Sequence, residues 1–141
     1  MILLDGVART YRGEDLAAWR AIRAQVLGDY GAAVPIRAVE LRVPRYDCAV
    51  GDERRPGYVI LCSNRKDPTV GGWGGSNEVG GGAAVIVFRR LDLARYYFCH
   101  ELGHVLGLGH RFDGQSCMSG WEGKAFVPWP DQHDLDSLRA S

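Results

Sequence analysis

Three of the chain's four histidines lie in one short stretch, CHELGHVLGLGHRFDGQSCMSG, which runs from Cys99 to Gly120. His100 and His104 are four residues apart, so on an α-helix they lie about 40° apart around the axis and both imidazoles can reach one metal ion. Glu101 follows one step further round the helix. A carboxylate placed there can take a proton from water at the metal without being a ligand itself. This spacing indicates a metal site that can do chemistry.

The same stretch offers a third ligand. A catalytic zinc ion usually has three protein ligands and leaves a fourth position to water, whereas a structural zinc ion has four. His110 is the candidate, provided that the chain turns after His104, and Gly107 permits that turn because glycine readily adopts positive φ. A shuffled chain of this composition would contain His-Glu-x-x-His-x-x-Gly-x-x-His roughly once in tens of thousands of trials. Neither Cys99 nor Cys117 lies in the Cys-x-x-Cys pair typical of structural zinc, so a catalytic zinc site is favoured.

Helices and strands must position these residues. Apolar periodicity predicts an early amphipathic helix, three strands, a long apolar helix that carries the histidines, and a short closing helix with Asp131 near its N-cap. The glycine-rich segment 70–82 lacks the Lys-Ser/Thr ending of a phosphate-binding loop and is expected to be a loop or a glycine-broken edge strand bordering a cleft. The predicted ranges are 14–28, 91–106 and 131–140 for the helices and 35–43, 57–62 and 83–89 for the strands. The order indicates one α+β domain over residues 1–141.

Composition narrows the class of partner. The chain has 141 residues, 46% of them apolar and 24% charged, with 17 basic against 17 acidic side chains. This balance argues against a nucleic-acid groove or an anionic membrane as the main partner. No apolar segment approaches the ~18 to 20 residues of a membrane span, and the start, MILLDGVARTYRGED, does not have the pattern of a secretory signal. The protein is either a mature form, exported by another route, or retained inside the cell.

The stretch from Cys99 to Gly120 also resembles the sequence pattern of a known family. HELGHVLGLGH, followed by the methionine of SCMSG, is similar to the HExxHxxGxxH pattern and methionine turn of the metzincin zinc endopeptidases. The resemblance implies a metzincin-like (zincin) α+β domain, in which a small mixed sheet and an early helix precede an active-site helix, a glycine turn, a Met-turn and a short C-terminal helix. It also implies one catalytic zinc ion with His100, His104 and His110 as ligands, Glu101 as general base, Gly107 as the turn, and Met118 packed beneath the ligands.

Within the metzincins, the sequence looks most like small bacterial matrixin-like or snapalysin-like proteases, with several departures. Arg111, directly after the third histidine, matches no subfamily marker, and snapalysins usually carry Asp where this chain has His110. Gly120 stands where some relatives have a tyrosine that assists the transition state, so no such role is assigned. Calcium near Asp113 or Asp67 is possible, but no spaced acidic loop supports it.

The cysteines give a further expectation. In a metzincin-like fold the methionine turn lies under the ligand helix, so we expect a disulfide between Cys99 and Cys117, with Cys48 and Cys62 as the second pair. Each pair requires Cα atoms within ~7 Å of one another. Disulfides and the family resemblance favour a secreted or extracellular protein, while the lack of a signal sequence leaves an intracellular location open.

The resemblance implies a zinc-dependent endopeptidase whose protein or peptide substrate lies extended along an edge strand, here around residues 70–75. The side-chain pocket is expected after Met118, and the protein is expected to be a monomer. Two other functions stay open: a zinc-binding module without turnover, which would have no need of Glu101, and an amide hydrolase acting on cell-wall peptides. Candidate substrate contacts are Trp73, Gly74, Trp121 and Trp129, although the last two tryptophans are equally compatible with core packing.

Overall fold

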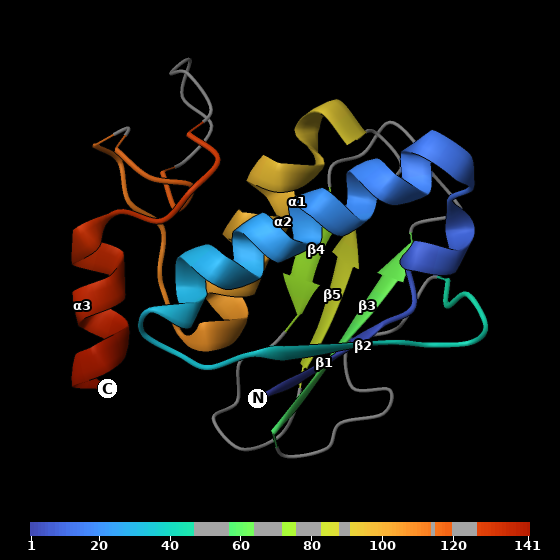
Figure 1. Cartoon of the computed structure of the whole chain (residues 1–141). Coiled ribbons are helices and arrows are strands. Elements are labelled where there is room, and N and C mark those ends of the chain that lie inside the picture. Colours follow the sequence, from blue (N-terminus) through green and yellow to red (C-terminus); the bar gives the residue numbers. More distant parts are fainter. Residues whose placement is uncertain (47–56, 64–71, 76–82, 88–90, 114, 120–126) are drawn as a thin grey trace.

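Five strands and three α-helices follow one another along the described part of the chain (Figure 1). The computed structural model describes residues 1–46, 57–63, 72–75, 83–87, 91–113, 115–119 and 127–141. The elements are β1 (Ile2–Asp5), the 3-10 turn η1 (Ala8–Thr10), α1 (Gly13–Gly31), β2 (Arg37–Glu40), β3 (Tyr58–Ser63), β4 (Gly72–Gly75), β5 (Ala83–Val87), α2 (Leu91–Leu106) and α3 (Gln132–Ala140). The fold is α+β, as predicted.

The five strands form one mixed sheet in the order β2-β1-β3-β5-β4. Neighbouring strands are parallel from β2 to β5, whereas β4 runs antiparallel to β5. The glycine-rich β4 is an edge strand, which agrees with one of the two forms expected for its segment. Strand β1 was not predicted, because a run of four residues ending in an aspartate carries little signal for a strand.

Both long helices lie on the same face of the sheet (Figure 1). Alternate side chains of β3 separate accordingly: Val59 and Leu61 join the main core with Trp19 and Phe98, whereas Ile60 belongs to a smaller cluster on the opposite face. Each large apolar side chain that is fully buried in this way contributes about 1.5–3 kcal/mol. None of the described helices is both long enough and apolar enough to cross a membrane.

A buried aspartate fastens α1 to the end of β1. One carboxylate oxygen of Asp5 accepts hydrogen bonds from Trp19 Nε1 at 2.9 Å and from the Arg23 guanidinium at 2.6 Å. The other oxygen accepts from the backbone N–H groups of Val7 and Ala8 at 2.8 and 2.9 Å. An unpaired buried carboxylate would be strongly destabilising. These four hydrogen bonds compensate the buried charge of Asp5 and hold α1 against the sheet.

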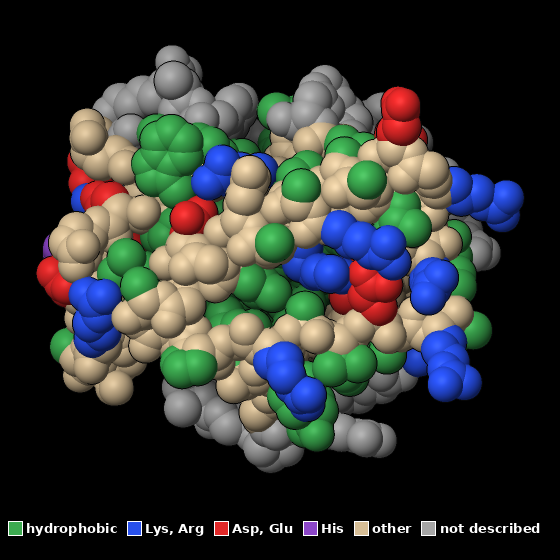
Figure 2. Space-filling model, in the orientation of Figure 1, with side chains coloured by type: hydrophobic (Ala, Val, Ile, Leu, Met, Phe, Trp, Pro, Cys, Tyr) green, Lys and Arg blue, Asp and Glu red, His purple; other side chains and the backbone are tan. Residues whose placement is uncertain are grey.

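A second ionic contact joins α1 to β2 at the surface. Arg20 donates two hydrogen bonds to the carboxylate of Glu40, at 2.7 and 2.9 Å, and Arg23 donates a third at 2.9 Å. Figure 2 shows acidic side chains enclosed by basic ones on this face. The hydrogen bonds from Arg20 lower the pKa of Glu40 to about 2.

The predicted helices agree with the structure to within a few residues. The early helix is longer at its carboxyl end than predicted, and α2 has the predicted bounds. Asp131 caps α3: its carboxylate accepts from the backbone N–H of Asp134 at 3.0 Å, and the Asp134 carboxylate accepts from the N–H of Asp131 at 3.2 Å. This reciprocal capping box confirms the expected N-cap.

Candidate metal centre

Helix α2 carries two of the three histidines and ends just after them. The N–H of Gly107 donates to the carbonyl of His104 at 3.0 Å, and the N–H of Leu108 donates to the carbonyl of Gly103 at 2.9 Å. With Gly107 at a φ of 106°, this pair of bonds is the Schellman arrangement that ends a helix on a left-handed residue. The chain therefore turns back at Gly107 and brings His110 to the ligand face of α2.

The three histidine side chains converge through their Nε2 atoms. Nε2 of His104 lies 3.0 Å from Nε2 of His100 and 3.0 Å from Nε2 of His110, and the remaining pair is 3.2 Å apart. Three nitrogens bound to one tetrahedral zinc ion at about 2.0–2.1 Å stand about 3.3–3.4 Å from one another. The cluster thus has nearly the size of a His₃ zinc site. His100 is buried, His104 is half-buried and His110 is exposed, so the cluster opens to solvent at one side.

Hydrogen bonds at the other ring nitrogens determine which tautomer is present. Nδ1 of His100 lies 2.7 Å from the carbonyl oxygen of Cys117, and Nδ1 of His104 lies 2.8 Å from that of Leu108. A carbonyl only accepts, so both Nδ1 atoms carry the proton and both Nε2 atoms present lone pairs. Two lone pairs that face each other at 3.0 Å cannot form a hydrogen bond. A shared cation is the partner that satisfies both of them.

The imidazoles of His100 and His104 are also in the protonation state that a metal ligand requires. Burial lowers the pKa of His100 to about 4. Burial also lowers the pKa of His104. Both imidazoles are therefore neutral near pH 7, which is the form that binds a metal. The residues fit the zinc ion that the sequence pattern predicts.

Met118 packs against the ligand helix at Gly103, the residue before His104. A Cβ atom on Gly103 would lie 2.3 Å from the sulfur of Met118 and 2.6 Å from the hydroxyl of Tyr30, so only glycine fits at this position. Met118 is fully buried. The methionine that follows the histidines in the sequence thus supports the helix that carries two of them.

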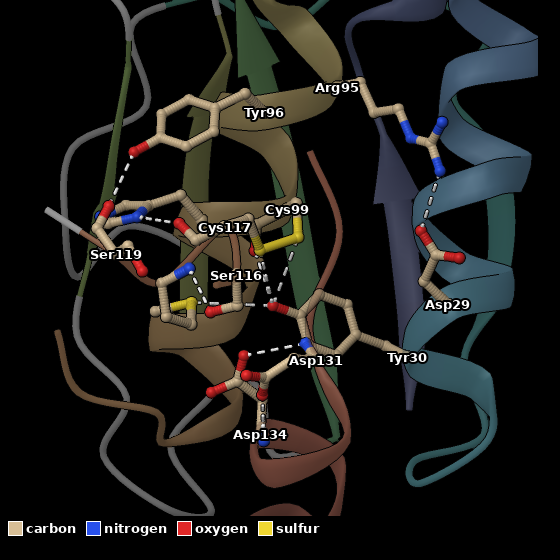
Figure 3. Close-up of a disulfide and its surroundings, with 12 residues drawn as sticks. Asp29, Tyr30, Arg95, Tyr96, Cys99, Ser116, Cys117, Ser119, Asp131 and Asp134 are labelled. Atoms are coloured by element: carbon tan, nitrogen blue, oxygen red, sulfur yellow. Dashed lines mark hydrogen bonds and ion pairs between the residues drawn. A yellow bond between two sulfur atoms is a disulfide. The ribbon is translucent and has the colours of Figure 1, made fainter. Parts of the chain in front are cut away.

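The predicted disulfide between Cys99 and Cys117 is present, with Cα atoms 6.0 Å apart (Figure 3). The backbone of Cys117 makes two hydrogen bonds: its carbonyl accepts from His100, and its N–H donates to the carbonyl of Trp129 at 2.8 Å. The hydroxyl of Tyr30, at the end of α1, donates to the carbonyl of Cys99 at 2.8 Å. The disulfide therefore joins α2 to the segment that orients His100. Cys48, of the second predicted pair, lies outside the described residues.

The predicted general base lies next to the first ligand. Glu101 follows His100 on α2 and is 9% exposed. Adjacent positions on a helix are about 100° apart, so Glu101 and His100 cannot both point along the same line. The arrangement leaves Glu101 at the flank of the histidine cluster rather than within it.

The candidate substrate residues come from different parts of the chain. Trp73 and Gly74 belong to the edge strand β4, and Trp121 lies outside the described residues. Trp129 is exposed, and its ring lies against the guanidinium of Arg95, 5.6 Å from the ring centroid. Arg95 is five residues before His100, which is about 140° around the helix. Trp129 therefore packs on a different face of α2 from the ligands.

Three residues that the sequence did not assign contribute to the surroundings. Tyr30 contacts the disulfide segment from α1, and Tyr96 stacks on His100 with ring centroids 5.9 Å apart while its hydroxyl donates to the carbonyl of Ser119 at 3.1 Å. Arg111, known from the sequence only as an unusual residue after His110, forms ion pairs with three aspartates. Only Tyr96 carried a local signal, because it lies four residues before His100 on the same helix.

Comparison with solved structures identifies the fold. Metalloproteinase-II from Bacteroides fragilis superposes with a TM-score of 0.56 at 16% identity, covering 99% of this chain and 51% of that protein. An archaemetzincin from Methanopyrus kandleri superposes with a TM-score of 0.54 at 18% identity, covering 99% and 92% of the two chains. This chain therefore shares the overall fold of these two structures, and spans about half the length of the first of them. The sequence matches no protein-family model and no curated protein.

Proposed function

We propose that this protein is a zinc-dependent endopeptidase of the metzincin type, with His100, His104 and His110 as the zinc ligands. The observation that carries the proposal is the convergence of three Nε2 atoms, two of which are held as lone-pair donors by backbone carbonyls. The fold supports it, because one of the two similar structures is a metalloproteinase and the other is an archaemetzincin. The sequence pattern from His100 to Met118 favours the small matrixin-like or snapalysin-like group.

Glu101 is the general base of the proposed reaction. Zinc, when bound, supplies a Lewis acid that polarises the scissile carbonyl and makes water a nucleophile near neutral pH. Glu101 takes a proton from the attacking water and delivers it to the nitrogen of the leaving amine. The exposed side of the cluster at His110 admits the substrate. Met118, packed against Gly103, acts as the Met-turn residue that supports the ligands.

The substrate is a protein or peptide bound in an extended conformation. Support comes from β4, the last strand in the sheet order: it pairs with β5 on one side, and no other strand of the described residues pairs with it on the other. Because α2 packs against β4, a strand added to this edge would run beside the ligand helix. Trp73 and Gly74 are then the nearest candidate contacts. The disulfide favours an oxidising, extracellular location.

Metal analysis combined with activity measurements tests the proposal. We expect the purified protein to hold about one zinc ion per chain and to cleave denatured protein and a peptide library, with activity lost on chelation and restored by zinc. Glu101→Gln should keep zinc and lose activity by about 100-fold to 10,000-fold, the range ascribed to general acid–base catalysis. His104→Ala should lose both the metal and the activity. Glu14→Gln, an exposed change on α1, is the matched control.

The outcomes separate the alternatives. Zinc-loaded protein that cleaves none of these substrates would contradict the enzyme and favour a zinc-binding module. Hydrolysis restricted to peptidoglycan would favour the amide hydrolase acting on cell-wall peptides. A Glu101→Gln variant that cleaves peptides at close to the parent rate would remove Glu101 from the mechanism.

A further inference from the structure

The third histidine is held differently from the other two. Carbonyl oxygens at Nδ1 fix the imidazoles of His100 and His104, whereas within the described residues Nδ1 of His110 has no hydrogen-bond partner. His110 is also exposed, so little packing restrains its ring. Among the described residues, the backbone on either side of His110 therefore offers the restraint on this imidazole.

Arg111 is the residue that fixes that backbone. Its N–H donates to the carbonyl of Met118 at 2.8 Å, which joins the segment after His110 to the methionine segment. Its guanidinium donates to Asp131 at 2.5 Å and to Asp134 at 3.1 Å, and it forms a further ion pair with Asp113. The side chain of Arg111 thus joins the segment after His110 to the first turn of α3.

The partners of Arg111 are themselves fixed. Asp131 and Asp134 cap each other's backbone at the start of α3, and Asp113 accepts from the N–H of Gln115 at 3.1 Å. Asp134 is only 1% exposed, so its carboxylate depends on the guanidinium for compensation. The three carboxylates raise the pKa of Arg111 through these hydrogen bonds, that from Asp131 first. A planar guanidinium with several donors can serve three carboxylates at once, whereas the ammonium group of a lysine cannot reproduce this geometry.

We propose that Arg111 is a positioning residue for the third metal ligand: by anchoring the backbone next to His110 to α3, it holds that imidazole where it meets the other two. The inference rests on the proposed zinc site and adds α3 to the parts of the chain that determine metal affinity. Removing an outer partner of a metal ligand typically weakens binding 10-fold to 100-fold. Because Arg111 acts through the backbone, we expect the lower end, about tenfold.

Zinc affinity, measured by competition with a chromogenic chelator, tests this role at a temperature where every variant is folded. Arg111→Gln and Asp134→Asn should each bind zinc about tenfold more weakly, and the double variant should be no weaker than either, because both changes break one anchor. Arg139→Gln is the matched control: this arginine lies on α3 itself, where it pairs with Asp136 at 2.9 Å, and its loss should leave zinc affinity unchanged. With cobalt in place of zinc, the absorption spectrum of Arg111→Gln should differ from that of the parent, whereas the spectrum of Arg139→Gln should not.

A purely structural role gives a different result. The double variant no longer contains an unpaired buried carboxylate, so its thermal stability should partly recover relative to Arg111→Gln. Zinc affinity that recovers in parallel, or an Arg111→Gln variant within twofold of the parent, would overturn the inference. If Arg111→Gln does not fold, Arg111→Lys takes its place, because it keeps the charge but not the geometry of the guanidinium. Zinc affinity equal to that of the parent in Arg111→Lys would also overturn the inference. A parent protein that binds no zinc would instead overturn the proposed function itself.

Discussion

Removal of the disulfide between α2 and the methionine segment should lower stability by an amount that the structure defines. The double variant Cys99→Ser/Cys117→Ser opens a loop whose ends are 18 residues apart in sequence. The chain-entropy treatment of cross-links gives about 3 kcal/mol for a loop of this length. In a chain of 141 residues, each kcal/mol corresponds to about 3–4 °C in the melting temperature, so we expect melting about 10 °C below the parent.

Thermal melts followed by circular dichroism, without and with reductant, measure this difference. Under strong reductant the parent loses the same cross-link, so the gap between parent and variant should shrink to about 2 °C, and any other bridge is reduced in both proteins and cancels. A gap of about 10 °C that persists in reductant would show that buried sulfur, rather than the bond, supplies the stability. A gap below about 3 °C without reductant would refute the entropic estimate.

Two further changes probe packing and charge. Gly103→Ala places a methyl group 2.3 Å from the sulfur of Met118 and should destabilise the fold by about 1–3 kcal/mol in urea unfolding, whereas Gly28→Ala, a helical glycine with open space around it, should stabilise it by up to about 1 kcal/mol. Equal effects of the two would contradict the close approach. Glu40→Gln should cost about 1 kcal/mol near neutral pH. Because the hydrogen bonds from Arg20 lower the folded-state pKa from 4.5 to about 2, this difference should persist above pH 4.5 and vanish as the pH falls through about 2. Unfolding curves across that range that stay a constant distance apart would contradict the assignment.

Local signals in the sequence predicted the parts of the structure that depend on local geometry. The helix over residues 91–106, its end at Gly107 and the convergence of His100, His104 and His110 all follow from helical periodicity and from the conformational freedom of one glycine. The capped start of α3 was visible for the same reason, since an N-cap aspartate acts within one turn.

Contacts between distant segments carried no such signal. Arg111 meets Asp134 across 23 residues, and Tyr30 meets Cys99 across 69. Nothing in the composition of either segment marks these pairs, because an ion pair or a hydrogen bond between remote residues leaves no periodic pattern. The sheet order and the short strand β1 were invisible for a similar reason: four residues are too few to show alternation, and pairing depends on the whole fold.

Helix α2 holds its functional and its packing residues within the same few turns. His100 and His104 present the ligand atoms, while Phe98 and Leu102, between and beside them, are fully buried in the main core. A systematic substitution scan of this helix should therefore yield few variants that lose activity and keep full stability. Under the proposed function, new specificity would more readily arise from changes along β4, which borders the helix without carrying a ligand, so selection could vary substrate recognition while leaving α2 nearly untouched.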